Sequence, residues 1–326
     1  MLLLTKSVLS IMLGFIFAVL IGLILIPLLK KLKVNQRLSI YMQNAHKKKN
    51  GTPTMGGLIF IIPTIITTLV LFFMGKISIT NNLLIVLFVF IGYALIGFID
   101  DYLIIKRNNN KGLTEIQKLL LQVVIATIFF FLFLKNGGAT SLVISTLNIN
   151  IEMGWLYGIF ILFILVGGSN AVNITDGLDG LAGGLSSIAF IAFGLISISS
   201  GNEDLGIFSF ILTGSIIGFL VFNTYPAKIF MGDTGSLALG AVLASIAILS
   251  RRELTLIIVA GIFVIETLTV IIQIISIKCF NKKVFLMTPL HHHFEKLGWH
   301  EVDIVKLFWT IGFVLCMAGI FFGVWL

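Results

Sequence analysis

The chain has 326 residues, of which 58% are hydrophobic and 11% are charged, and its formal net charge is +8. A soluble domain carries about 25% charged residues, so this composition excludes that class and predicts a membrane protein with several spans. The only cysteines are Cys279 and Cys316, which excludes a disulfide framework and a cysteine metal site.

Ten apolar runs approach the length of about 20 residues that spans a bilayer as a helix. We therefore expect one all-α integral membrane domain over residues 1–326, with about ten transmembrane helices. The first run follows Lys6 as a signal peptide would, but it is too long and lacks a cleavage site, so it is interpreted as a retained span. The runs cover about residues 8–29, 55–74, 82–99, 116–134, 155–169, 180–199, 206–222, 235–250, 254–277 and 304–325.

The basic residues predict the orientation, because lysine and arginine gather on the cytoplasmic side of membrane proteins. With both termini outside, all but five of the 22 basic residues lie inside. Topology thus accounts for most of the basic runs, and no nucleic-acid partner is expected. Glu203 and Asp204 fall in a short outer loop and are interpreted as solvated. The five outer basic residues are Lys6, Lys76, Lys135, Arg251 and Arg252.

The longest basic segment, residues 30–54, includes Lys47 to Lys49 and leads through Thr54 into Gly56 and Gly57. Such a lysine run usually anchors the chain at lipid headgroups. A contact with a phosphate or nucleotide is the alternative. The two glycines permit close approach of backbone or ligand.

Asp100 and Asp101 end the third apolar run in the sequence GFIDDYL. The C-terminal end of a helix carries partial negative charge, so capping does not explain two aspartates there, and they need a cation or basic neighbour. Adjacent helical positions point about 100° apart, so the two carboxylates are expected to face different groups. A salt bridge to Lys106 or Arg107 is the structural alternative.

The stretch NAVNITDGLDGLAGG at residues 170–184 places Asp176 and Asp179 between two apolar runs. Ionisable residues beside a membrane span are rare and costly, and so are functional candidates. Either aspartate could instead cap the helix that follows.

A third polar stretch, FNTYPAKIFMGDTGSLALG at residues 222–240, includes Asn223, Phe230 and Asp233. Asp233 could cap the next helix. Gly232 and Gly235 open backbone amides towards an anion, as helix N-termini beside phosphates do. Phe230 is interpreted as a packing residue that could also stack on a base.

Glu266 lies within the ninth apolar run, so it must be protonated, paired across helices or facing water. The loop that follows predicts a short helix that ends near Gly298. Its apolar residues Leu290, Phe294 and Leu297 share one side, leaving His291 and His292 to face elsewhere. Three consecutive histidines could suggest zinc, but only two can converge and no cysteine assists, so phosphate hydrogen bonding is favoured.

The predicted topology brings these polar residues to the same cytoplasmic side, whereas independent caps would scatter over both faces. Acidic residues grouped in this way suit magnesium-dependent phosphate chemistry, because Mg²⁺ binds oxygen ligands and bridges substrate phosphates. The residues are Lys49, Asp100, Asp101, Asp176, Asp179, Asp233 and His291 to His293.

Five ordered motifs resemble a known enzyme family. The chain closely resembles the phospho-N-acetylmuramoyl-pentapeptide transferases (translocase I) of the polyprenyl-phosphate sugar-1-phosphate transferase superfamily. The unbroken HHH before FEKLGW resembles the muramoyl-pentapeptide branch more than the N-acetylglucosamine branch. The motifs are TPTMGG at 52–57, GFIDDY at 97–102, NITDGLDGLAGG at 173–184, FNTYPAKIFMGDTGSLALG at 222–240 and PLHHHFEKLGW at 289–299.

This resemblance implies a reaction and its partners. Phospho-MurNAc-pentapeptide would pass from UDP-MurNAc-pentapeptide to undecaprenyl phosphate, with Mg²⁺, giving lipid I and UMP in the first membrane step of peptidoglycan synthesis. It also implies a homodimer in a bacterial plasma membrane with cytoplasmic catalytic loops.

The resemblance also assigns roles to residues. Asp233 resembles the metal ligand, and Asp100 and Asp101 resemble aspartates that bind or deprotonate the lipid phosphate. His291 and His292 resemble histidines on the phosphate or sugar side. The implied uridine pocket is Lys49, Gly177, Leu178, Asp179 and Phe230, with Asn170, Asn173, Asp176 and Asn223 nearby; further candidates are Gly232, Thr54, His293 and Glu266.

Two departures and two alternatives remain. Ile104 and Ile116 stand where many members carry lysine, so Lys106 or Lys111 is expected to substitute, and no Pro or Gly interrupts residues 262–277, where the family helix is broken. A transferase of N-acetylglucosamine phosphate would share the chemistry. A secondary transporter is disfavoured. Transporter sites lie near the membrane midplane, often within internal repeats, whereas the acids of this chain, Glu266 excepted, are expected at one interface and no repeat is seen.

Overall fold

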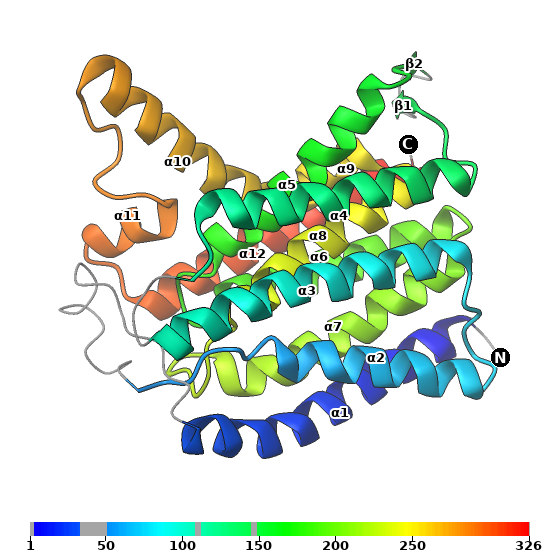
Figure 1. The fold of residues 1–326 in the computed structure, drawn as a ribbon, viewed down its shortest axis with the longest axis horizontal. Helices are drawn as coiled ribbons and strands as arrows, with labels where there is room; N and C mark the ends of the chain where they lie inside the picture. Colours follow the sequence, from blue (N-terminus) through cyan, green and yellow to red (C-terminus); the bar gives the residue numbers. More distant parts are fainter. Residues whose placement is uncertain (1–2, 33–50, 108–111, 145–148, 326) are drawn as a thin grey trace.

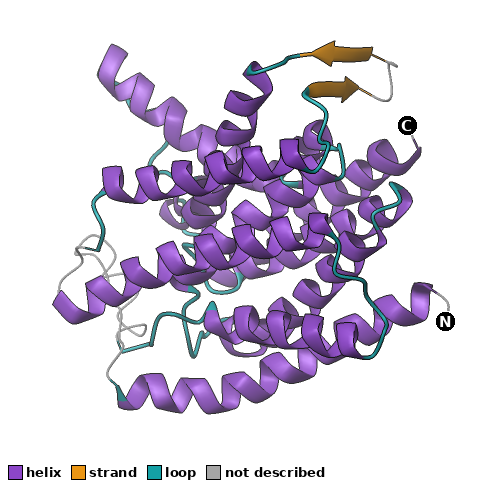
Figure 2. Cartoon of the chain, turned by 45° about the vertical axis from the view of Figure 1, so that its right-hand side comes forward, coloured by secondary structure: helices purple, strands orange, loops and turns teal. Residues whose placement is uncertain are grey.

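The structure of the chain is a computed structural model that describes residues 3–32, 51–107, 112–144 and 149–325 (Figure 1). In these ranges the regular elements are helices, apart from one antiparallel two-stranded hairpin (Figure 2). The all-α prediction is therefore confirmed, although the hairpin was missed. The elements are α1 Leu3–Lys31, α2 Leu58–Phe73, α3 Asn81–Arg107, α4 Glu115–Lys135, β1 Ser141–Ile144, β2 Ile149–Glu152, α5 Leu156–Thr175, α6 Leu181–Ser199, α7 Glu203–Asn223, α8 Gly232–Leu249, α9 Glu253–Val259, α10 Gly261–Phe280, α11 Leu290–Lys296, α12 Glu301–Ile320 and the π-helical turn η3 Phe321–Trp325.

Each of the ten predicted apolar runs contains a helix. Within the described ranges, eight helices are long and apolar enough to cross a membrane, and two apolar helices, α2 and α8, are shorter. This pattern is that of a multi-pass membrane protein.

The ninth apolar run is split into two helices. α9 ends at Val259, Ala260 separates it from α10, and α10 begins at Gly261. The interruption lies immediately before residues 262–277, which explains why no glycine or proline in that window signals it. In Figure 1, α10 and the first turns of α5 diverge from each other above the bundle.

The core is built around α6, α7 and α8, whose residues are mostly buried. Small residues allow α1 to pack directly against α7: a Cβ on Gly214 would lie 2.1 Å from the carbonyl oxygen of Ile11, and one on Gly218 would lie 2.6 Å from Cβ of Ala18. Close helix packing of this kind stabilises membrane bundles, where lipid supplies no hydrophobic driving force.

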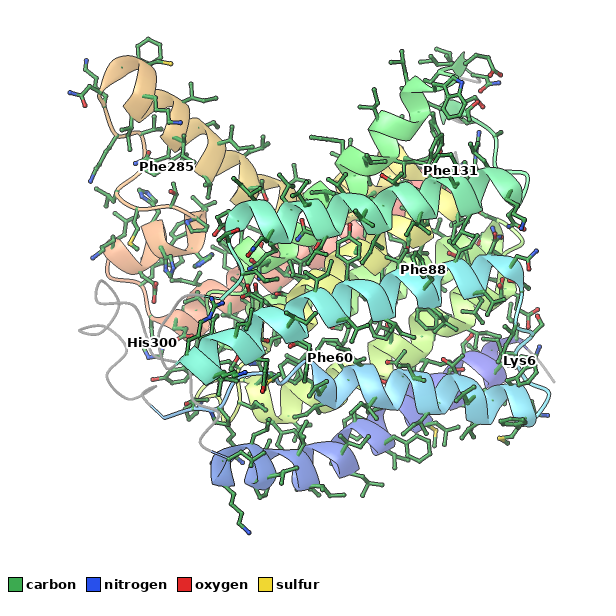
Figure 3. All side chains as sticks on the ribbon, viewed as in Figure 1. Lys6, Phe60, Phe88, Phe131, Phe285 and His300 are labelled. Carbon is green, nitrogen blue, oxygen red and sulfur yellow. The ribbon has the colours of Figure 1, made fainter. Side chains whose placement is uncertain are left out.

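The two ends of the bundle differ. Both chain termini and the hairpin lie at one end, whereas α11 lies at the other (Figure 1). Lys6 and His300 mark these opposite ends in Figure 3. We call the first the terminal end and the second the site end, which includes residues 51–57, 97–107, 112–118, 170–181, 223–236 and 281–301.

Candidate active site

The backbone of residues 53–57 pairs with residues 230 and 231. Phe230 N donates to Pro53 O at 2.8 Å, Gly56 N donates to Phe230 O at 2.8 Å, and Gly57 N donates to Met231 O at 2.9 Å. A Cβ on Gly57 would lie 2.5 Å from Cα of Gly235, so only glycine permits this approach. Two motifs far apart in sequence are thus joined through their backbones.

Asp101 is buried and holds the start of α8. Its carboxylate accepts hydrogen bonds from Thr234 N at 3.0 Å, Thr234 Oγ1 at 2.6 Å and Asp233 N at 3.3 Å. The interpretation that capping cannot explain the aspartate pair is therefore wrong for Asp101, which caps a neighbouring helix and not its own. A Cβ on Gly97, one turn earlier, would lie 2.1 Å from Asp233 O, so glycine is needed here too.

Asp100 faces a different group, as the 100° offset predicts. It accepts a hydrogen bond from Leu113 N at 2.8 Å and lies 3.4 Å from Nζ of Lys118. Lys118 also lies 2.5 Å from Oδ2 of Asp233. One ammonium group from α4 therefore joins carboxylates of α3 and α8, and its charge offsets theirs.

Lys118 was missed as a site residue, and the alternative of a salt bridge from Asp100 to Lys106 or Arg107 is not what the structure has. Lys106 lies over the ring of Tyr102, 6.0 Å from its centroid, and Arg107 donates to Gly112 O at 2.9 Å. Lys111 lies outside the described residues. A signal existed, because Lys118 follows the capping box that begins α4, and a lysine near a helix N-terminus opposes the helix dipole.

Asp233 is held on its other side by α5. Asn173 Nδ2 donates to Asp233 Oδ1 and to Ser236 Oγ, each at 2.8 Å. Asn170, one turn earlier, instead donates to Gln122 Oε1 at 2.8 Å and ties α5 to α4. Of the two asparagines, only Asn173 therefore touches the aspartates.

The aspartate cluster offers oxygen donors but no complete metal cage. Among the described side chains, no three of His, Cys, Asp or Glu are arranged to hold an ion alone. Thr54 Oγ1 is buried and has no hydrogen-bond partner in the part of the chain that the structure describes. A Cβ on Gly232 would lie 2.7 Å from it and 2.5 Å from Asp101 Oδ2. Such a set fits Mg²⁺, which takes one or two carboxylates and completes its shell with water and substrate phosphate.

Residues 176–180 form a loop between α5 and α6 that three other segments hold. Asp179 N donates to Glu301 Oε1 at 2.7 Å, Ala227 N donates to Asp179 Oδ2 at 2.9 Å, and Gly180 N donates to Asn223 Oδ1 at 3.1 Å. The N-cap of α6 is Gly180, and the first turn of that helix holds no acidic residue. Asp176 follows the end of α5. The helix-capping alternative for the two aspartates is therefore wrong.

Other predicted contacts around this loop have mixed outcomes. Asn223 also donates to Ile229 O at 2.9 Å, so it shapes the loop through its amide. Leu178 is buried and Phe230 is half-buried. Lys49 lies outside the described residues. Glu301, which sequence reasoning missed, is positioned in the first turn of α12, where a carboxylate is favourable.

The short helix after α10 was predicted, but the burial of its histidines was not. His291 and His292 are buried, whereas Leu297 is 53% exposed. The physical reason is two carboxylates: Glu266 Oε1 lies 3.1 Å from His291 Nδ1, and Glu295 Oε2 lies 2.6 Å from His292 Nδ1. Of the three possibilities for Glu266, pairing across helices is the observed one. His293 Nδ1 accepts a hydrogen bond from Leu286 N at 3.1 Å, which orders the preceding loop.

An apolar groove of about 290 Å³ runs beside the site between α5, α8, α9 and α10. Gly167 and Gly168 leave room along α5, and a Cβ at Gly167 would meet nothing within 4 Å. Ala171 and Val172 also line the groove, so it reaches to within one residue of Asn173. The groove therefore extends along α5 towards Asn173, which donates to Asp233.

Comparisons with known proteins agree with this geometry. Residues 83–251 match the sequence profile of glycosyl transferase family 4, and residues 49–61 match signature 1 of the phospho-N-acetylmuramoyl-pentapeptide-transferases.

Curated relatives match along almost the whole chain, and those compared are named phospho-N-acetylmuramoyl-pentapeptide-transferase. The Bacillus subtilis (strain 168) protein is 48% identical over 318 residues, covering 97% of this chain and 98% of the relative. The Shouchella clausii protein is 49% identical over 314 residues, 96% of each chain, and the Bacillus licheniformis protein is 47% identical over 317 residues, covering 97% and 98%.

Proposed function

The chain belongs to the phospho-N-acetylmuramoyl-pentapeptide-transferase family, and we propose that it transfers phospho-MurNAc-pentapeptide from its UDP carrier to undecaprenyl phosphate, forming lipid I and UMP. The observation that carries this proposal is the convergence of Asp100, Asp101 and Asp233 beside an apolar groove. An aspartate cluster at the end of a helix that also lines an apolar groove suits an acceptor that arrives from the bilayer.

In the proposed reaction, an oxygen of the lipid phosphate attacks the phosphorus that carries the sugar. The bond between that phosphorus and the bridging oxygen breaks, and UMP leaves with the electron pair. The lipid phosphate is already ionised near neutral pH, so the protein needs mainly to position it and to offset charge. Lys118 and Asn173 fix the carboxylate of Asp233, while Asp101 fixes the backbone beneath it.

Mg²⁺ is part of the proposal. Asp233 and Asp100 would hold the ion, which would offset the charge that develops on the splitting diphosphate. Asp101 is less available, because its carboxylate already accepts three hydrogen bonds from α8.

The donor would lie on the loop of residues 176–180. Asp179 and Asn223 shape that loop, and Phe230 offers a half-buried ring to stack against the base. His291 and His292 would meet the phosphates. We propose that this end faces the cytoplasm of a bacterial cell, since the donor is a nucleotide, and that the protein acts as a homodimer in the plasma membrane.

UMP release tests the reaction. Purified protein in detergent would receive undecaprenyl phosphate and either UDP-MurNAc-pentapeptide or UDP-GlcNAc, with and without Mg²⁺. We expect turnover of the muramoyl donor alone, and only with the metal. Turnover of UDP-GlcNAc alone would show that the protein transfers N-acetylglucosamine phosphate by the same mechanism. No turnover by folded protein would contradict the proposal.

Asp233→Asn tests the metal site within the same assay. The amide cannot bind Mg²⁺ as a carboxylate does, so turnover should fall by about three orders of magnitude. Full activity in a folded Asp233→Asn variant would exclude Asp233 as the metal ligand.

A further inference from the structure

The most buried acid–histidine pair of the site end lies outside the aspartate cluster. Glu266 on α10 is 1% exposed and His291 on α11 is 0% exposed. Glu266 Oε1 accepts the backbone N–H of His291 at 3.2 Å and faces Nδ1 of the same residue at 3.1 Å. One carboxylate oxygen therefore fixes both the main chain and the ring of His291.

The second nitrogen of the ring points at residues 176–180, the loop proposed to hold the donor. His291 Nε2 is buried and has no hydrogen-bond partner among the described residues. A Cβ on Gly177 would lie 2.3 Å from it, so the nitrogen lies directly against the loop of residues 176–180. Buried polar atoms are nearly always hydrogen-bonded, so an unpaired one at a predicted binding loop points to a ligand.

The carboxylate decides which nitrogen is left for that ligand. The hydrogen bond made by one ring nitrogen fixes the tautomer and the direction of the other. Because Glu266 Oε1 acts as an acceptor for the His291 backbone, we infer that Nδ1 carries a hydrogen towards it. Between this carboxylate and a phosphate oxygen, the ring would donate through both nitrogens.

We propose that Glu266 is a positioning residue, which holds His291 so that Nε2 meets a phosphate oxygen of the nucleoside-diphosphate donor at Gly177. This inference rests on the proposed transferase function. Glu266 does not touch the reacting atoms; it acts through His291. The pair formed by His292 and Glu295 differs, because both residues belong to α11 and cannot fix α11 against another helix.

The helix that carries Glu266, α10, also lines the apolar groove. It does so with Val264, Thr267 and Leu268, the neighbours of Glu266. One helix therefore faces the proposed lipid with one side and orients a donor contact with the other.

Glu266→Gln tests the proposal by steady-state kinetics with UDP-MurNAc-pentapeptide and undecaprenyl phosphate varied in turn. We expect kcat/KM for the nucleotide donor to fall about tenfold or more, while KM for the lipid changes little. Glu253→Gln is the matched control, since Glu253 is also buried and bonded to a side chain, Tyr157, but lies at the terminal end. Its donor kinetics should equal those of the wild type.

Nitrogen-15 NMR of labelled histidines gives a readout that does not need activity. The His291 signal is assigned by its loss in His291→Gln, and we expect a protonated Nδ1 in the wild type and a changed signal in Glu266→Gln. If Glu266→Gln fails to fold, Glu266→Asp serves in its place, because it keeps the charge but shortens the reach.

The outcomes separate the two proposals. An inactive wild type would overturn the transferase function. An active wild type whose Glu266 variants keep the donor kinetics and the Nδ1 signal would overturn only the role of Glu266, as would an equal loss in Glu253→Gln.

Discussion

Both ends of the helix bundle bury carboxylates, but they use them differently. At the terminal end, the buried Asp204 accepts a hydrogen bond from Thr80 and the buried Glu253 accepts one from Tyr157, while the exposed Glu203 pairs with Lys6 at 2.5 Å. Each of these acids has a direct partner that ties helix ends or loops together. Such acids stabilise the bundle and need no ligand.

At the site end, some carboxylates share a cation and others have oxygens that are not fully hydrogen-bonded. Asp100 and Asp233 share one cation, Lys118. Thr54 Oγ1 beside the cluster and one oxygen of Glu266 have no hydrogen-bond partner within the described chain. Burial of an acid in a membrane protein is therefore not sufficient evidence of function; sharing and incomplete hydrogen bonding are the better indicators.

Replacement of the shared cation gives the largest expected difference between the two ends. Lys118→Met keeps the length of the side chain but leaves two carboxylates facing each other. Breaking a largely buried ion pair costs about 3 kcal/mol of unfolding free energy, and loss of the aligned Asp233 should lower turnover by about 100-fold. Thermal unfolding in detergent and UMP release measure the two effects.

Lys6→Met is the counterpart at the terminal end. Its ion pair with Glu203 is solvent-exposed, and pairs of this kind contribute at most about 1 kcal/mol. Turnover should be unchanged. Wild-type activity in Lys118→Met would show that the shared cation serves only the fold.

Two glycines sharpen the comparison at a smaller scale. A Cβ on Gly97 would lie 2.1 Å from Asp233 O, whereas one on Gly75 would meet nothing within 4 Å. Gly97→Ala must displace the backbone that carries Asp233, and a shift of about 1 Å at a reacting group costs up to about 100-fold in rate. Gly75 has φ +65, so Gly75→Ala should cost about 1 kcal/mol of stability through strain alone, without loss of turnover. Equal turnover in both variants would contradict the tight contact at Gly97.

The sequence predicts the spans and the grouping of polar residues, because both follow from hydropathy and from the distribution of basic residues. It does not predict which groups meet. Lys118 and Asp233 are 115 residues apart, and Thr80 and Asp204 are 124 residues apart. Asp204 was interpreted as solvated because it falls in a short outer loop, but it is buried and accepts a hydrogen bond from Thr80.

Local patterns also failed where tertiary contacts override them. Leu290 and Phe294 of α11 pack partly against the core, as an apolar side should, yet His291 is buried as well because Glu266 offers a carboxylate from another helix. The break at Ala260 carries no proline, and the hairpin of β1 and β2 is too short for a clear alternating pattern. Pairing across helices is a property of the packed bundle, which a linear pattern does not encode.

The smallest expected effect concerns pH at the terminal end. Burial raises the pKa of Glu253, although the hydrogen bond from Tyr157 and the nearby arginines Arg251 and Arg252 lower it in part. The folded state thus binds this proton more tightly than the unfolded state. Its contribution to stability is fully present below the usual glutamate pKa of about 4.3 and is lost as pH rises through the raised pKa.

Glu253→Gln removes this dependence, so the Tm of the variant should change less with pH than that of the wild type over the window that begins near pH 4.3 and extends upward. Tyr157→Phe should extend the window to higher pH, because it removes a donor that favours the ionised carboxylate. Thermal unfolding at several pH values measures both shifts, and turnover at neutral pH should match the wild type in Glu253→Gln. A parallel Tm profile in Glu253→Gln and wild type would show that this carboxylate keeps its ordinary pKa. A loss of turnover would instead connect the terminal end to the chemistry and remove the distinction between the two ends.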